Sequence, residues 1–254
     1  MICSEKAVPD MSIKDDARFL KLSYTFNNYE EMIREAEDVN QPIGEFLQDL
    51  LDREVNLRLE NGQKKRVRSA RFPQKKYLVD FKTDHYDKEL SRKINSLKSL
   101  DFIRDKENLI LIGNPGTGKT HLATALGIEA CMDGMTVLFT SVPNLVIELK
   151  EAMSLQQVSL YKKKFEKYDL VILDELGYIS FDKEGNEILF NLLSNRNDRG
   201  SIIITTNLMF DRWQEVFMDP VLTGALVDRL AHRAHVLDMS GDSYRIKDTK
   251  EWLV

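Results

Sequence analysis

The chain has 254 residues, of which 43% are hydrophobic and 30% charged, with a formal net charge of −5, and this composition describes a soluble globular protein. No apolar stretch approaches 18 residues, and charged side chains interrupt any signal-like segment at the start, so we expect a cytoplasmic protein with no membrane partner. Two cysteines, Cys3 and Cys131, are too few for a disulfide framework or a zinc site.

The first 60 or so residues are expected to be helical. Residues 43–59, IGEFLQDLLDREVNLRL, repeat apolar side chains three and four positions apart, as on one face of a helix, and Pro42 suits its first turn. That face comprises Ile43, Phe46, Leu47, Leu50, Leu51, Val55 and Leu59. Such a short segment needs a surface to cover it, either an earlier helix within residues 19–32 or another subunit.

The next stretch, residues 62–76 (GQKKRVRSARFPQKK), is basic and contains no acidic side chain. A basic stripe on an acidic chain is the electrostatic footprint of a polyanion, although a solvated linker would have the same composition. Pro73 breaks this stretch, and we place the boundary there, with a helical N-terminal domain at 1–76 and a second domain at 77–254. The basic side chains are Lys64, Lys65, Arg66, Arg68, Arg71, Lys75 and Lys76.

From residue 77 onward, short apolar runs alternate with helical patterns, which predicts an α/β fold with a parallel five-stranded sheet and covering helices. The expected strands are residues 109–112, 136–140, 170–173, 201–205 and 235–239. The expected helices are residues 121–131, 142–153, 184–195 and 221–233.

The first expected strand runs into the sequence GNPGTGKT, which has the spacing G-x-x-x-x-G-K-[ST] of a phosphate-binding loop. Backbone N–H groups of such a loop surround an anion at the start of a helix, so the pattern predicts nucleotide binding. Lys119 is expected to reach the β- and γ-phosphates, and the Thr120 hydroxyl is expected to ligate Mg²⁺. A dinucleotide-binding loop is excluded because it would need glycine at His121. The loop residues are Gly113, Asn114, Pro115, Gly116, Thr117, Gly118, Lys119 and Thr120.

Two later strands end in polar side chains. LVILDEL places Asp174 and Glu175 after four buried positions, where Asp174 is expected to hold the metal and Glu175 to orient the attacking water as general base. SIIITTN then presents Asn207, whose amide we expect to contact the γ-phosphate and the water. Small-molecule kinases need no such glutamate, so the pair favours ATP hydrolysis.

These motifs in this order resemble an ATPase of the AAA+ class, and most closely the IstB-type transposition helper ATPases, which are relatives of the DnaC helicase loaders and the DnaA initiator. Segments 68–81, 107–127 and 168–196 carry the likeness, which covers nearly the whole chain. The resemblance implies a helper that assembles on double-stranded DNA as an ATP-dependent homo-oligomer, remodels it and presents it to a partner transposase. A DnaC-like helicase loader is the alternative, because it shares every ATPase motif.

The resemblance also implies two roles that spacing alone does not, an arginine finger and a first sensor, and the chain departs from the family at its end. Arg229, in LVDRLAHR, falls where the initiator relatives place the arginine finger, and Arg233 is the second choice. Asn207 takes the place of the first sensor. Only fifteen residues follow Met239, too few for the C-terminal helical lid that most AAA+ proteins carry, so the fold is expected to lack that lid, with Arg245 a weak substitute for its sensor arginine.

A second basic element lies where the initiator relatives carry a helical insertion, within residues 142–168. Its run YKKKFEK contributes Lys162, Lys163 and Lys164. Neither this element nor the basic stretch at 62–76 interleaves aromatic residues with its charges, so we expect contacts to DNA phosphates with little reading of base sequence.

Overall fold

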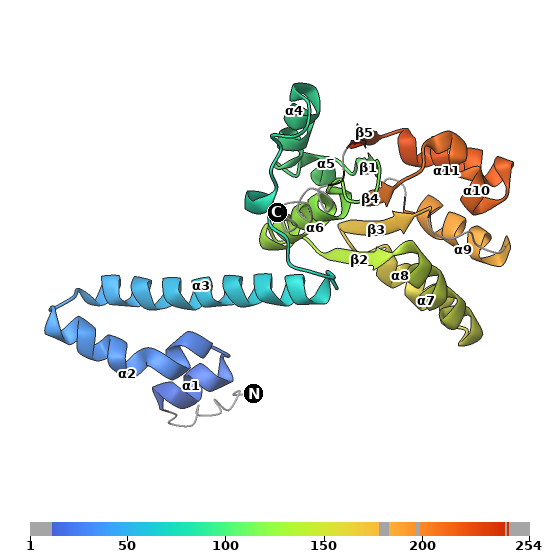
Figure 1. Cartoon of the computed structure of the whole chain (residues 1–254). Coiled ribbons are helices and arrows are strands. Elements are labelled where there is room, and N and C mark those ends of the chain that lie inside the picture. Colours follow the sequence, from blue (N-terminus) through green and yellow to red (C-terminus); the bar gives the residue numbers. More distant parts are fainter. Residues whose placement is uncertain (1–11, 178–182, 197–198, 242, 244–254) are drawn as a thin grey trace, which may run out of the picture. The chain divides into compact units, whose positions relative to one another are not determined.

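The computed structural model describes residues 12–177, 183–196, 199–241 and 243 (Figure 1). The chain forms two compact units, residues 1–64 and 65–254. This division falls earlier than the boundary expected at residue 76, because the end of the basic stretch packs within the second unit. Ala70 is fully buried there, its carbonyl accepts the backbone N–H of Phe139, and the rings of Phe72 and Phe139 meet edge to face.

The described part of the first unit is helical, with α1 at Ile13–Phe19, α2 at Ser23–Asp38 and α3 at Ile43–Ser69, which continues past the division between the units. Ser12 caps α1 by accepting the backbone N–H of Asp15. The residue before α2 provides no such side-chain cap. Instead, the buried carboxylate of Glu54 on α3 accepts the backbone N–H groups of Ser23, Tyr24 and Thr25 at 2.7 to 3.2 Å.

The residues of the apolar face that the sequence predicts on 43–59 fall into two groups that differ in exposure. Phe46 and Leu50 are half-buried and lie on the side of α3 that also buries Glu54. The other five members of that predicted face are exposed. The helix itself is confirmed, but the earlier helices cover only part of its apolar surface. The exposed members are Ile43, Leu47, Leu51, Val55 and Leu59.

The second unit is built on a five-stranded parallel sheet in the order β2-β3-β4-β1-β5, as expected from the sequence. Each expected strand is present within a few residues of its predicted bounds. The strands are β1 at Asn108–Ile112, β2 at Val137–Ser141, β3 at Leu170–Leu176, β4 at Ser201–Thr206 and β5 at Ala234–Asp238.

Helices cover both faces of this sheet (Figure 1). One face packs against α4 (Lys88–Leu97), α5 (Asp101–Arg104) and α6 (Lys119–Met132). The other packs against α7 (Val142–Ser154), α8 (Val158–Phe165), α9 (Lys183–Ser194), α10 (Gln214–Phe217) and α11 (Pro220–Ala231). Short 3₁₀ turns lie at Leu78–Asp80 and Phe210–Arg212. No described helix is long and apolar enough to cross a membrane. The expected absence of a C-terminal lid concerns residues that lie outside the described part of the chain.

A buried arginine links the end of α8 to the residues at the starts of β3 and β4. Arg196 has no exposed surface, and its guanidinium donates to the carbonyls of Phe165, Tyr168 and Ser201. Burial lowers the pKa of Arg196 to about 10, so the group stays charged at neutral pH. Sequence reasoning missed this residue, since nothing in its local pattern distinguishes it from a surface arginine.

Candidate nucleotide-binding site

The phosphate-binding loop links β1 to α6 and depends on glycine at two close approaches. A Cβ at Gly113 would lie 2.7 Å from the carbonyl carbon of Met239, next to β5. A Cβ at Gly118 would lie 2.9 Å from the Tyr86 hydroxyl, and Gly118 has φ of 93°, in the left-handed region. The loop therefore bends tightly between the end of β5 and the side chains of Tyr86 and Phe81, where an added side chain would collide.

Lys119 is the first residue of α6 and is only 7% exposed. Its ammonium donates to the carbonyls of Gly113 and Asn114, both at 2.7 Å. The ammonium therefore lies against the loop that is expected to bind the phosphates. The Thr117 hydroxyl donates to the Asn114 carbonyl at 2.9 Å and holds the loop closed on itself. This arrangement places one cation and the start of a 14-residue helix at the same point, as binding of a triphosphate requires.

The two residues expected to hold a metal ion are in direct contact. The Thr120 hydroxyl of α6 donates to Oδ1 of Asp174 on β3 at 2.9 Å, and Asp174 is 6% exposed. One hydroxyl and one carboxylate suit Mg²⁺, which takes few protein ligands and fills its remaining positions with water and phosphate oxygens. The described residues contain no cluster of three or more His, Cys, Asp or Glu side chains that could hold a metal ion.

Glu175 is presented by an irregularity in the sheet. The pairing of β3 with β4 shifts register between Leu173 and Leu176, and Glu175 has φ of 65°, a strained value for a residue other than glycine. Its backbone N–H donates to the Thr205 hydroxyl at 3.0 Å, and its side chain is exposed. A bulge of this kind changes the direction in which a side chain points. The Glu175 side chain is therefore exposed, while Asp174 stays buried.

Asn207 follows β4 directly and lies beside the end of β3. Its Oδ1 is buried and has no hydrogen-bond partner among the described residues. A Cβ added to Gly177, just after β3, would lie 2.9 Å from this oxygen. The structure therefore places Asn207 beside the carboxylate strand, as the sequence order suggests, with an amide oxygen able to accept a further hydrogen bond.

Two further residues, Tyr86 and Phe81, lie against the loop and were not predicted from the sequence. The Tyr86 hydroxyl donates to the Thr117 carbonyl, and Phe81 meets the ring of His121 edge to face at 5.2 Å between centroids. Burial lowers the pKa of the His121 imidazole, and the nearby Lys76 ammonium lowers it further. The spacing of these aromatic side chains matches no motif, so only the fold shows that they wall one side of the loop.

Comparison with known proteins identifies the family of this chain. The profile of one family, described as IstB-like ATP binding protein, matches residues 15–251. The chain belongs to the IstB-like ATP-binding family. It is 35% identical to the IS21 insertion-sequence ATP-binding protein of Pseudomonas aeruginosa over 91% of this chain and 88% of that protein. It is 37% identical to the IS232 counterpart of Bacillus thuringiensis over 80% of this chain and 82% of that protein.

Solved structures show that this IstB-like chain has the AAA+ fold. A crystal structure of the DnaC helicase loader superposes with a TM-score of 0.56 at 18% identity, covering 66% of this chain and 98% of the loader. The AMPPCP-bound DnaA of Aquifex aeolicus gives a TM-score of 0.58 at 20% identity, covering 72% of this chain and 55% of DnaA. These similarities concern the ATPase fold, which the sequence predicts correctly.

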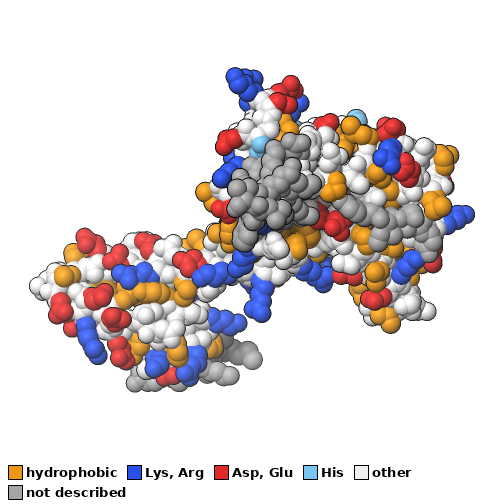
Figure 2. All heavy atoms as spheres, in the orientation of Figure 1, with side chains coloured by type: hydrophobic (Ala, Val, Ile, Leu, Met, Phe, Trp, Pro, Cys, Tyr) orange, Lys and Arg blue, Asp and Glu red, His pale blue; other side chains and the backbone are white. Residues whose placement is uncertain are grey.

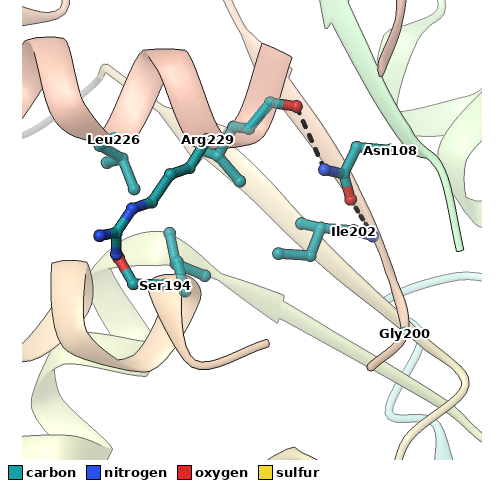
Figure 3. A pocket seen from close by; sticks show the side chains of 8 residues that line it. Asn108, Ser194, Gly200, Ile202, Leu226 and Arg229 are labelled. Carbon is teal, nitrogen blue, oxygen red and sulfur yellow. Dashed lines mark hydrogen bonds between the residues drawn. The ribbon is translucent and has the colours of Figure 1, made fainter. Parts of the chain in front are cut away.

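Arg229 of the IstB-like chain lies near the amino ends of the strands, whereas its own phosphate-binding loop lies at their carboxyl ends. It lines a cavity of about 10 Å³ with Asn108 and Ile202, near the amino ends of β1 and β4, whereas the loop follows the carboxyl end of β1 (Figure 3). Such a cavity holds one water at most, so it is no ligand site. Arg229 is exposed and stacks over the ring of Phe190 at 5.3 Å. The second choice, Arg233, donates to the Asp105 carbonyl at 3.2 Å.

The basic residues of the IstB-like chain differ in how far they are engaged within it. Arg66 donates to the Cys131 carbonyl at 2.8 Å, and Arg71 forms an ion pair with Glu148 at 2.7 Å. Lys64 pairs with the exposed Glu60 one turn away. Lys65 and Arg68 have exposed side chains near the end of α3.

The second basic element of the IstB-like chain, Lys162, Lys163 and Lys164, forms the last turn of α8. Lys163 and Lys164 are exposed, and Lys162 is half-buried. These side chains are therefore available on the surface of the second unit, as phosphate contacts require.

Proposed function

We propose that this protein is an ATP-hydrolysing transposition helper that assembles on double-stranded DNA, remodels it and recruits or stimulates a partner transposase. The observation that carries the proposal is the contact of Thr120 with Asp174 beside a bulge that presents Glu175. Its relatives are named as ATP-binding proteins of insertion sequences, which supports the transposition role over other uses of the fold.

For hydrolysis, the loop residues 113–120 bind the triphosphate, and Thr120 and Asp174 hold Mg²⁺, which when bound offsets charge on the phosphate oxygens. Glu175 accepts a proton from the attacking water and orients it, because its carboxylate is exposed next to the buried metal-holding carboxylate. The Asn207 Oδ1 accepts a hydrogen bond from the same water. Lys119 stabilises the charge on the β- and γ-phosphates.

The site needs a second cation from another subunit. Arg229 lies across the length of β1 from its own loop, a strand of five residues that spans about 16 Å, so it is too far to contact the nucleotide of its own subunit. An exposed arginine at this edge can reach a neighbouring subunit's loop in a homo-oligomer. Hydrolysis would then depend on assembly.

For DNA, lysines and arginines of α3 and α8, with Arg71 just after α3, supply phosphate contacts. Figure 2 shows Lys and Arg side chains gathered near the end of α3. The DNA-contacting residues in this proposal are Lys64, Lys65, Arg66, Arg68, Arg71, Lys162, Lys163 and Lys164. Since these charges are not interleaved with aromatic side chains, binding should depend on salt more than on base sequence.

The deciding experiment combines DNA binding with partner capture. Tagged protein is loaded with ATP or ADP, its affinity for two unrelated duplexes is measured by fluorescence anisotropy, and it is then offered the transposase from its insertion sequence and the replicative helicase of its host. We expect tighter DNA binding with ATP, equal affinity for both duplexes, and capture of the transposase alone. Capture of the helicase alone would establish a helicase loader, and phosphoryl transfer to a metabolite without stimulation by DNA would establish a small-molecule kinase.

A further inference from the structure

The side chain of Arg229 packs against helix α9 of its own subunit. Its guanidinium carbon lies 5.3 Å from the centroid of the Phe190 ring, and Arg229 itself is exposed. Ser194, one turn of α9 further on, lines the same small cavity as Arg229. Figure 3 shows the Ser194 hydroxyl on the side of α9 that faces the arginine. The guanidinium therefore lies along the face of α9 that carries Phe190 and Ser194.

This contact leaves the guanidinium able to bind an anion. A cation stacked on an aromatic ring is attracted by the face of the ring and donates no hydrogen bond to it. Among the described residues, no carboxylate forms an ion pair with Arg229. Arg196 and Arg233, in contrast, donate to backbone carbonyls. The N–H groups of Arg229 thus remain available to a phosphate.

The side chains that support Arg229 are themselves fixed. Phe190 is half-buried and packs against the core of the second unit. Leu189, Leu192 and Leu193 anchor the same helix, since all three are buried. The Ser194 Oγ is also buried and has no hydrogen-bond partner among the described residues, so it can accept a guanidinium N–H. An unsupported arginine on a helix surface samples many rotamers, whereas these contacts favour the few that lie along α9.

We propose that Phe190 is a positioning residue for Arg229, whose guanidinium it holds at the subunit surface in the orientation that reaches a neighbouring subunit's nucleotide. The inference rests on the proposed role of Arg229 as the arginine finger, and adds that the finger is prepared by its own subunit before assembly. Such preorganisation lowers the barrier to hydrolysis, because the cation needs no further ordering when the subunits meet. Phe190 contacts neither the nucleotide nor the attacking water in this proposal and acts only through Arg229.

Complementation between inactive subunits isolates this role. Lys119→Ala donates an arginine but has no working loop, and Arg229→Ala has the loop without the arginine, so phosphate release by their mixture measures the donated arginine. We expect a donor with Lys119→Ala and Phe190→Leu to lower that rate about three- to tenfold, the scale of one cation–π contact. The KM for ATP should not change, because the Arg229→Ala subunit binds the ATP. A donor with Phe190→Tyr, which keeps an aromatic ring, should support the rate of the parent donor.

Placing the same substitution in the acceptor tests for a merely structural effect. An acceptor with Arg229→Ala and Phe190→Leu has no arginine for the ring to hold, so it should perform as Arg229→Ala does. Loss of activity in this placement as well would show that Phe190 only maintains the fold. A Phe190→Leu donor that equals or exceeds its parent would exclude positioning by the ring while leaving Arg229 as the finger. An inactive mixture of the two parent variants, with mixed oligomers present in native mass spectrometry, would remove the finger and this inference together.

Discussion

The hydroxyl of Thr205 on β4 donates to the carboxylate of Asp174 on β3. The same hydroxyl accepts the backbone N–H of Glu175, so one side chain fixes both the Asp174 carboxylate and the backbone that presents Glu175. Thr205 is 2% exposed, and water cannot readily replace it there. Asp174 is buried for the metal and Glu175 is exposed for the water. This arrangement therefore depends on Thr205 of the neighbouring strand β4.

Replacing Thr205 with valine tests this dependence. The change keeps the side-chain shape but removes a hydrogen bond to a charged group, which contributes about 1.5–3 kcal/mol. We expect Thr205→Val to bind ATP but to hydrolyse it at least tenfold more slowly, measured by phosphate release. Thr205→Ser, which keeps the hydroxyl, should retain most of the activity. Normal hydrolysis by the valine variant would show that Thr205 does not position the pair.

Glu175 and Lys119 should separate hydrolysis from binding. Glu175→Gln leaves the loop intact and should bind a fluorescent ATP analogue normally while losing hydrolysis by two orders of magnitude or more, the scale of general-base catalysis. Lys119→Ala removes the ammonium at the loop and should lose binding itself. A Glu175→Gln protein that turns over ATP at the usual rate would exclude Glu175 as the base.

The position of the candidate nucleotide site could be predicted because local motifs mark it. Glycine spacing predicts the loop, and polar residues at the ends of apolar runs place Asp174, Glu175 and Asn207 near it, since the carboxyl ends of parallel strands meet at one end of the sheet. Thr205 and Tyr86 were missed as site residues because their roles come from neighbours 31 residues away in the chain. Local pattern contains no information about such pairings.

The helical unit was predicted less completely, for a different reason. Periodicity locates apolar residues on α3 but does not say which neighbour covers each of them, so Leu47 and Leu50 have the same pattern and different surroundings. Glu54 has the pattern of a surface acid, yet it is buried because the start of α2 has no side-chain cap of its own.

Glu54 should therefore matter more to the first unit than its charge suggests. Glu54→Ala removes the acceptor for three backbone N–H groups, and each unsatisfied group costs about 1–3 kcal/mol. We expect the amide hydrogens of Tyr24 and Thr25 to exchange with deuterium at least tenfold faster. Glu60→Ala, at an exposed acid on the same helix, should leave their exchange unchanged, since exposed ion pairs contribute little. Equal protection in Glu54→Ala would mean that α2 is capped in another way.

The basic end of α3 should determine how DNA binding depends on salt. Neutralising Lys64, Lys65, Arg66 and Arg68 together should weaken binding equally on unrelated duplexes and reduce the slope of log K against log salt by about 0.9 per lost phosphate contact. The double variant Lys65→Gln, Arg68→Gln should account for much of this loss, because those two side chains are exposed.

The control for this experiment is a pair of exposed charges elsewhere on the second unit, Arg92 and Lys93 on α4. Neutralising both with glutamine should leave the slope unchanged. An unaltered slope in the fourfold variant would assign the basic stretch to a solvated linker.

Arg229 should complete the active site of a neighbouring subunit. Arg229→Ala should bind ATP but hydrolyse it roughly 10³-fold more slowly, the scale of other arginine fingers. Mixing it with Lys119→Ala, which is also inactive alone, should restore part of the activity, measured as phosphate release across mixing ratios. Recovery follows because a Lys119→Ala subunit still offers its own arginine to the intact loop of an Arg229→Ala subunit.

Arg233→Ala is the matched control, because Arg233 lies four residues later and is engaged with the Asp105 carbonyl. It should remain active alone if Arg229 is the finger. Native mass spectrometry must show that mixed oligomers of the two inactive proteins form. If they form and the mixture stays inactive, Arg229 does not act across the interface, and loss of activity in Arg233→Ala would transfer the role to Arg233.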